Sequence, residues 1–286
     1  FTLIERTLMH FRVRAAVAIA AVATLSLTAC TAQTTTAGDD HSSALSTHVH
    51  AIITDPATGT TILGTHDGLL PVDADGGIGD PIGGYEFDAM GLAVTGDAFV
   101  ASGHPGANTP AEWGSPHLGI IRSDDAGQTW SPIAYTSEKD FHALTAGPDG
   151  TLYGLSTDEP AVLTSTDGGS TWTAAGANIS AYALTVDDTG TVYATTPGGV
   201  LFSVDGAVTF APVPDAPTLY LLSASPDHST LVGVDVEGTI WTSADAAVSW
   251  VEAGSADGQA QAIALTSSGE IAVADDSGLR LLGGAQ

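Results

Sequence analysis

Histidines stand at the starts and ends of short β-like runs in the first half of this sequence. Two of them lie two residues apart in STHVHAIITD, at His48 and His50. Three more occupy similar places, in GTHDG (His66), SGHPG (His104) and DFHAL (His142). Neutral imidazole is a good ligand for Zn²⁺ and Cu²⁺, so these residues could hold a transition metal together. They can do so only if the fold brings them to one place.

Composition excludes a nucleic-acid partner. The 286 residues include 6 Lys and Arg against 33 Asp and Glu, a formal net charge of −27. Nucleic acid binding requires basic patches that displace counterions, and this chain has too few basic residues to build one. The acidic surface favours a monomer. A single cysteine excludes a disulfide framework, so the stability of the fold must come from packing.

Residues 1–29 are typical of a signal peptide. Arg12 and Arg14 precede the apolar run AAVAIAAVATLSLTA, which is too short to span a membrane comfortably. LTAC at its end resembles a bacterial lipobox, so we expect cleavage before Cys30 and lipid attached to that cysteine. Ordinary secretory cleavage, which would leave Cys30 unpaired, is the alternative. We expect the true start at Met9.

The segment after the signal peptide predicts a flexible tether. Residues 30–47, CTAQTTTAGDDHSSALST, are small and polar, and we place His41 in this tether. Residues 48–286 would then form a single extracytoplasmic domain, anchored to the bacterial cell membrane as a lipoprotein. Cleavage would leave three of the six basic residues and 32 of the 33 acids, a net charge of −29.

A repeated octapeptide sets the period of this domain. SDDAGQTW (123–130) and STDGGSTW (165–172) match closely, and SVDGAVTF (203–210) and SADAAVSW (243–250) are weaker copies. Their third residues are spaced by 42, 38 and 40 positions. Four short β-like runs recur in each unit of roughly 40 to 45 residues, which is typical of a β-propeller blade. The sequence predicts an all-β propeller of six four-stranded blades.

The sixth blade ends before its outer strand. The segment just before His48 is the candidate to complete this blade and close the ring. Residues 44–47 are very short for a strand, which makes the closure the weakest part of the predicted fold.

The motif S-x-D-x-G-x-T-W resembles the Asp-box, or BNR repeat, of sialidase-like β-propeller proteins, across blades two to five. The resemblance implies a hairpin turn between the third and fourth strands, where the Asp carboxylate accepts backbone N–H groups. Glycine would take a positive φ and Trp would pack between sheets. It also implies that the boxes are structural and lie opposite the ligand site. The residues concerned are Ser123, Asp125, Gly127, Trp130, Ser165, Asp167, Gly169 and Trp172.

Aligning the blades places the histidines at one mouth of the ring. The first strand of each blade lines the channel and starts on the face where the loop between second and third strands lies. His48 lies on the same side of its strand as His50, while His66 and His104 end second strands and His117 starts a third. The alignment puts six residues at one level of the first strands: His50, Gly91, His142, Tyr182, Tyr220 and Ala262.

The favoured hypothesis is therefore a protein that binds a ligand, in particular a transition metal such as Cu or Zn, at this mouth. Gly91 would leave room for the ion or a small ligand, and Tyr182, Tyr220 and Trp113 are further candidate ligand contacts. The predicted metal ligands are His48, His50, His66, His104 and His142.

The resemblance to sialidases makes a glycoside hydrolase the second hypothesis. Sialidases clamp the substrate carboxylate with three arginines, and the expected domain has only Arg122 and Arg280, which disfavours true sialidase activity. Another hydrolase would need two carboxylates across a cleft. We assign no catalytic residue, and the candidates at the mouth are Asp67, Glu112, Asp158 and Glu159. A protein-interaction scaffold is the third hypothesis, because fold alone does not determine function.

Overall fold

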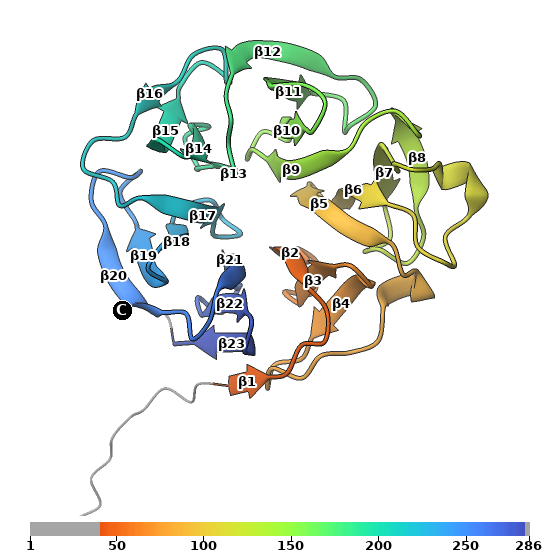
Figure 1. Ribbon diagram of the computed structural model, residues 1–286, viewed down its shortest axis with the longest axis horizontal. Helices are drawn as coiled ribbons and strands as arrows, with labels where there is room; N and C mark the ends of the chain where they lie inside the picture. Colours follow the sequence, from red (N-terminus) through yellow and green to blue (C-terminus); the bar gives the residue numbers. More distant parts are fainter. Residues whose placement is uncertain (1–40, 284–286) are drawn as a thin grey trace, which may run out of the picture. The chain divides into compact units, whose positions relative to one another are not determined.

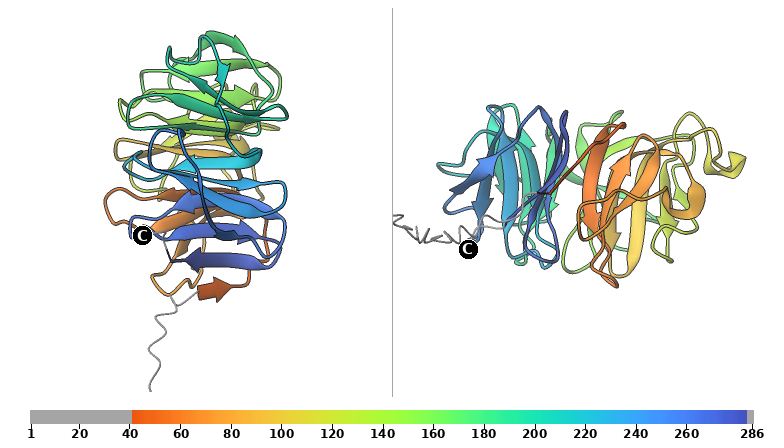
Figure 2. Two further views of the ribbon diagram at one scale, coloured as in Figure 1. Left: turned by 90° about the vertical axis from the view of Figure 1, so that its left-hand side faces the viewer. Right: turned by 90° about the horizontal axis from the view of Figure 1, so that it is seen from below.

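Antiparallel strands of two to eight residues build six sheets that follow one another around a central axis (Figure 1). The computed structural model describes residues 41–283. Seen from the side, the strands of each sheet run between the two faces of the ring (Figure 2). This architecture confirms the predicted all-β propeller of six blades. Within the described part of the chain, no helix has the length and apolar character to cross a membrane.

Each blade contributes one inner strand to the wall of the channel. The inner strands of blades one to six are β2 (Val49–Thr54), β5 (Asp88–Thr95), β9 (Phe141–Ala146), β13 (Ala183–Val186), β17 (Leu219–Ala224) and β21 (Ala260–Leu265). The second strands are β3 (Thr61–Thr65), β6 (Ala98–His104), β10 (Leu152–Ser156), β14 (Val192–Thr196), β18 (Leu231–Asp235) and β22 (Ile271–Asp275).

The outer half of each blade is less regular. The third strands are β4 (Gly68–Val72), β7 (Ile120–Ser123), β11 (Ala161–Ser165), β15 (Gly199–Ser203), β19 (Thr239–Ser243) and β23 (Gly278–Leu282). Four blades have their own outer strand: β8 (Ser131–Ala134), β12 (Thr173–Asn178), β16 (Ala211–Pro212) and β20 (Val251–Ser255). Blade one has three strands, and the short helices η1 (Ile82–Gly84) and η2 (Ala111–Trp113) lie in loops of blades one and two.

A strand from the start of the described chain closes the ring. β1 (His41–Ser43) pairs antiparallel with β23, with Ser42 opposite Arg280. The closing strand therefore lies earlier than residues 44–47, and the ordered propeller begins before His48. His41, which we expected in the tether, belongs to this strand. The correction follows from pairing: a polar segment with no apolar pattern of its own forms a strand because β23 offers it an unpaired edge.

The apolar core lies between blades rather than within them. Side chains of β3, β10, β14, β18 and β22 are buried at every position, because each second strand is covered on both faces by neighbouring sheets. Trp130 of blade two packs with Ile62 and Leu69 of blade one, and Trp172 of blade three packs with Ile120 of blade two. Six such clusters hold the inner strands in place around the channel.

The Asp-boxes form the turns that the resemblance implied. Asp167 accepts hydrogen bonds from the Thr171 backbone N–H at 2.9 Å and from the Thr171 and Ser165 hydroxyls at 2.6 and 2.8 Å. Ser165 Oγ accepts from the Gly169 N–H at 3.0 Å, and the Trp172 indole donates to the Gly169 carbonyl at 2.8 Å.

The same pattern recurs around Ser123, Asp125, Gly127 and Trp130. Gly127 and Gly169 have φ of 85° and 97°, where L side chains are strained. The boxes join third to fourth strands, so they lie at the end of the ring opposite the histidine mouth, and they are structural.

Candidate metal centre

A β-bulge near the start of the inner strands determines which side chains face the mouth. Register shifts in five of the six inner strands each leave one residue unpaired. The residues skipped in this way are His50, Met90, His142, Tyr220 and Gln261. A bulge bends the strand and redirects the unpaired side chain, and such bulges are common beside functional sites.

The bulges correct the sequence alignment in two blades. Met90 and Gln261, rather than Gly91 and Ala262, are the structural equivalents of His50. Gly91 faces blade three instead, where a Cβ would lie 2.7 Å from the Phe141 carbonyl oxygen. Gly91 therefore allows close packing between β5 and β9. It does not provide the space for an ion at the mouth that we expected.

Two aspartates complete the cluster of histidines. Two residues before the bulge, blades one to three carry His48, Asp88 and Asp140, in the triplets HVH, DAM and DFH. Asp88 and Asp140 were not among the predicted ligands, because the sequence contains 33 acidic residues and nothing in its apolar pattern sets these two apart. We call the whole set the mouth cluster; it consists of His48, His50, His66, Asp88, His104, Asp140 and His142.

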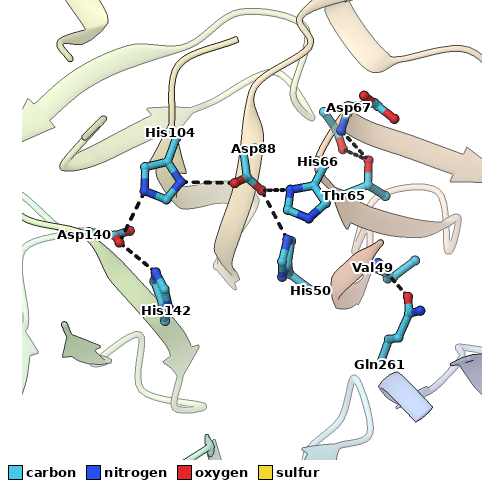
Figure 3. A network of polar contacts seen from close by, with 11 residues as sticks. Val49, His50, Thr65, His66, Asp67, Asp88, His104, Asp140, His142 and Gln261 are labelled. Carbon is cyan, nitrogen blue, oxygen red and sulfur yellow. Dashed lines mark hydrogen bonds and ion pairs between the residues drawn. The ribbon is translucent and has the colours of Figure 1, made fainter. Parts of the chain in front are cut away.

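The first triad consists of His50, His66 and Asp88. Asp88 Oδ1 lies 3.2 Å from His50 Nε2 and 2.9 Å from His66 Nδ1 (Figure 3). His48 lies beside these residues, with its ring centroid 4.8 Å from that of His50 and 5.7 Å from that of His66. Blade one supplies the imidazoles and blade two the carboxylate, so the triad spans the gap between two sheets.

The second triad consists of His104, Asp140 and His142. Asp140 Oδ2 lies 2.7 Å from His142 Nε2 and 3.4 Å from His104 Nε2. His104 also links the two triads, because its Nδ1 lies 3.1 Å from Asp88 Oδ2 (Figure 3). The Asp140 side chain is only 6% exposed. The imidazole of His117 lies beside that of His104, with ring centroids 5.5 Å apart.

The two carboxylates stay ionised. Burial alone would raise the pKa of Asp88, but the contacts with His50 and His104 outweigh it and lower the pKa to about 2. Burial alone would also raise the pKa of Asp140. The contact with His142 outweighs this effect, so the pKa of Asp140 is lowered. The Asp140 contact raises the pKa of His142 against the effect of burial. For His48, burial together with the nearby His50 and His66 outweighs the opposite effect of Asp276 and Asp88, so its pKa is lowered.

The ligand atoms of each triad have the separations of a coordination sphere. The nitrogen and oxygen atoms of each triad all lie within 4.8 Å of one another. Ligands about 2.0–2.1 Å from a tetrahedral zinc ion lie roughly 3.3 Å apart. The imidazole–carboxylate distances of 2.7 to 3.4 Å are close to this value. A cation could lie between these atoms after only small movements of the side chains. It would replace the protons that the ring nitrogens share with the carboxylates.

Two buried atoms at the mouth are left without a partner. Within residues 41–283, His117 Nδ1 and Asp140 Oδ1 have neither a hydrogen bond nor an ion-pair contact. Leaving a buried polar atom unpaired costs about 1–3 kcal/mol. Asp140 belongs to the second triad, so its free carboxylate oxygen is available to a cation bound there.

The other candidate carboxylates lie outside the two triads. Lys139 donates to Asp158 and Glu159 at 2.9 and 3.0 Å, so these carboxylates are paired with a cation of the protein. Asp67 is exposed in the β3–β4 turn, and Glu112 is exposed in η2.

The aromatic candidates differ in their surroundings. Trp113 is 2% exposed and packs on Tyr85 and Phe87, so it cannot be the ligand contact that we expected. A buried indole in this long loop was not foreseeable from its polar sequence neighbours. Tyr182 is 59% exposed and lines the channel, whereas Tyr220 packs towards blade six and donates its hydroxyl to the Ala260 carbonyl.

A cavity of about 500 Å³ follows the inner strands. His50, Met90 and His142 line it at the mouth, and Pro148 and His228 line it towards the opposite face. Small ligands could therefore reach both triads from the channel.

Comparison with known proteins supports the fold. No family model matches the chain, and no curated protein resembles it in sequence. A gluconolactonase from Xanthomonas campestris is 14% identical, with 82% of this chain and 85% of that one covered and a TM-score of 0.60. An auxiliary nutrient binding protein from Bacteroides thetaiotaomicron is 11% identical, with coverage of 82% and 69% and a TM-score of 0.61. A GH74 enzyme from Niastella koreensis is 19% identical, with coverage of 83% and 42% and a TM-score of 0.57.

At these identities the likeness is one of fold alone. Membership of the sialidase-like Asp-box family, expected from the repeats, stays a prediction. The chain is a six-bladed β-propeller whose solved structural neighbours include a gluconolactonase, a nutrient binding protein and a GH74 enzyme.

Proposed function

We propose that this protein is an extracytoplasmic, lipid-anchored β-propeller that binds transition metal ions, Cu²⁺ or Zn²⁺, at the mouth cluster. The observation that carries the proposal is the pair of triads, each with three convergent ligand atoms and an aspartate whose pKa is lowered; Asp140 is buried and Asp88 is partly buried. Imidazole and carboxylate suit both metals. With two triads available, we expect two ions per chain.

The N-terminal sequence and the structurally similar proteins support this proposal. The signal-peptide pattern and the lipobox-like LTAC favour attachment of the chain to the membrane through Cys30. A neighbour of the same fold is named a nutrient binding protein, which is compatible with a role in ligand capture outside the cytoplasm. The hydrolase alternative is weakened, since Asp158 and Glu159 are paired with Lys139 and Trp113 is buried, which leaves the exposed Asp67 and Glu112 as its candidates.

Metal content of the purified full-length protein tests the proposal. Apo protein would be loaded with Zn²⁺ or Cu²⁺, passed through a desalting column and analysed by mass spectrometry for bound metal. We expect about two equivalents in the wild type and almost none in the double variant His50→Ala/His142→Ala, which removes a ligand from each triad. His228→Ala is the matched control, because this histidine lies at the other end of the channel with its Nδ1 on the Val186 carbonyl. Equal uptake by the wild type and the double variant would refute the proposal.

A further inference from the structure

Met90 occupies the same backbone position as the two histidines that flank it around the ring. It is the bulged residue of β5, as His50 is of β2 and His142 of β9. All three line the mouth end of the channel. The inner strands of three consecutive blades therefore present imidazole, thioether and imidazole at one level.

Core packing does not explain this methionine. Met90 is partly exposed and belongs to none of the six apolar clusters between the blades. The chain has two methionines, Met9 and Met90, so Met90 is the only one in the propeller. A flexible apolar side chain normally fills gaps in a core. Here it instead lines the channel between two histidines.

The neighbouring blades indicate what Met90 can reach. In blade three the residue two positions before the bulge contacts the bulged residue directly, with Asp140 Oδ2 2.7 Å from His142 Nε2. In blade one the rings of His48 and His50 are 4.8 Å apart. Met90 stands in the same relation to Asp88, whose Oδ1 belongs to the first triad.

We propose that Met90 is the fourth ligand of the first triad and makes that triad a copper site able to hold Cu(I) as well as Cu²⁺. This inference rests on the proposed metal-binding function and adds the identity of the metal. A thioether is a soft ligand that binds Cu(I) well, whereas Zn²⁺ is served by imidazole and carboxylate alone. The set of two imidazoles, one carboxylate and one thioether therefore favours copper over zinc. The second triad has no sulfur and keeps the preferences of imidazole and carboxylate.

The test compares Met90→Leu with the wild type, both as full-length protein. Cu(I) affinity is measured by competition with a chromogenic Cu(I) chelator in the presence of ascorbate, and Zn²⁺ affinity by competition with a fluorescent zinc chelator. Loss of an outer-sphere partner of a metal costs about 10- to 100-fold in affinity, and loss of a ligand should cost at least that. We expect Cu(I) affinity of one site to fall at least tenfold, and Zn²⁺ affinity to change less than about twofold.

X-ray absorption at the copper edge provides an independent readout. The chain contains three sulfur atoms, in Met9, Cys30 and Met90. A copper–sulfur scattering shell present in the wild type and absent in Met90→Leu would assign the sulfur to Met90. His228→Ala is the matched control, because it changes a channel-lining residue away from the mouth and should leave the shell intact.

The outcomes separate the two proposals. Unchanged Cu(I) affinity in Met90→Leu, or an equal loss of Cu(I) and Zn²⁺ affinity, would overturn the role of Met90 while leaving metal binding in place. Absence of any metal uptake by the wild type would overturn the proposed function and this inference with it.

Discussion

Replacing Asp88 by Asn tests whether charge, rather than shape, organises the mouth cluster. Asn has nearly the same size but cannot balance the positive charge of protonated imidazoles. In the metal-free protein Asp88 lies within 3.2 Å of nitrogens of His50, His66 and His104. We expect Asp88→Asn to destabilise the apo protein in a way that depends on pH.

The size of the effect follows from the pKa of Asp88, which is about 2 in the folded protein against an ordinary value of 3.8. A difference of roughly 1.8 units corresponds to about 2.4 kcal/mol in favour of the charged form. The side chain is 20% exposed, so solvent screening reduces this to about 1–2 kcal/mol at pH 5. Because the folded-state pKa is lowered, the contribution is complete above pH 3.8 and is lost as the pH falls through 2.

The assay is urea denaturation in the presence of EDTA, followed by tryptophan fluorescence at several pH values between 5 and 2. The difference in unfolding free energy between wild type and Asp88→Asn should be about 1–2 kcal/mol at pH 5 and should shrink towards pH 2. Asp67→Asn is the matched control, because this exposed aspartate in the next turn has no ion pair among the described residues and should change little. A difference that stays constant across the pH range, or none at pH 5, would refute the electrostatic argument.

Two further predictions concern the frame that positions the site. Ser165→Ala removes the acceptor of the buried Gly169 N–H, and should cost about 1–3 kcal/mol and lower Tm by a few degrees in calorimetry, with metal uptake unchanged. Lost metal uptake would instead link the Asp-box to the mouth. Truncation before Ala44 removes β1 and leaves β23 as an open edge, so the protein should self-associate in ultracentrifugation and unfold at lower temperature than a chain that starts at residue 37. Identical behaviour of the two chains would mean that β1 contributes nothing to closure.

Periodicity was enough to predict the fold, because each blade carries its own strand pattern and most carry a recognisable turn. The convergence of His48, His50, His66, His104 and His142 also followed from topology, since strand starts and second-strand ends meet at one face of a propeller.

The parts that the sequence could not reveal have local physical causes. A β-bulge adds one residue without changing the apolar pattern. The sequence alignment of the blades therefore placed Gly91 at the position that Met90 occupies in the structure. Asp88 and Asp140 were hidden among 33 acidic residues, and only their position two residues before a bulge distinguishes them. Pairing of Asp158 and Glu159 with Lys139 depends on a loop contact across about 20 positions of sequence, which no period encodes.

The bulges also have a consequence for how such a ring can acquire new chemistry. The irregular backbone turns one residue of a blade out of the hydrogen-bonded ladder, while its neighbours in sequence, such as Val49 and Phe141, remain anchored in the core. Side chains at bulged positions that lie outside the apolar clusters, such as His50, Met90 and His142, can therefore be exchanged with little effect on packing. In this protein the five bulged positions carry His, Met, His, Tyr and Gln. Another combination of side chains at these positions would suit another ligand on the same scaffold.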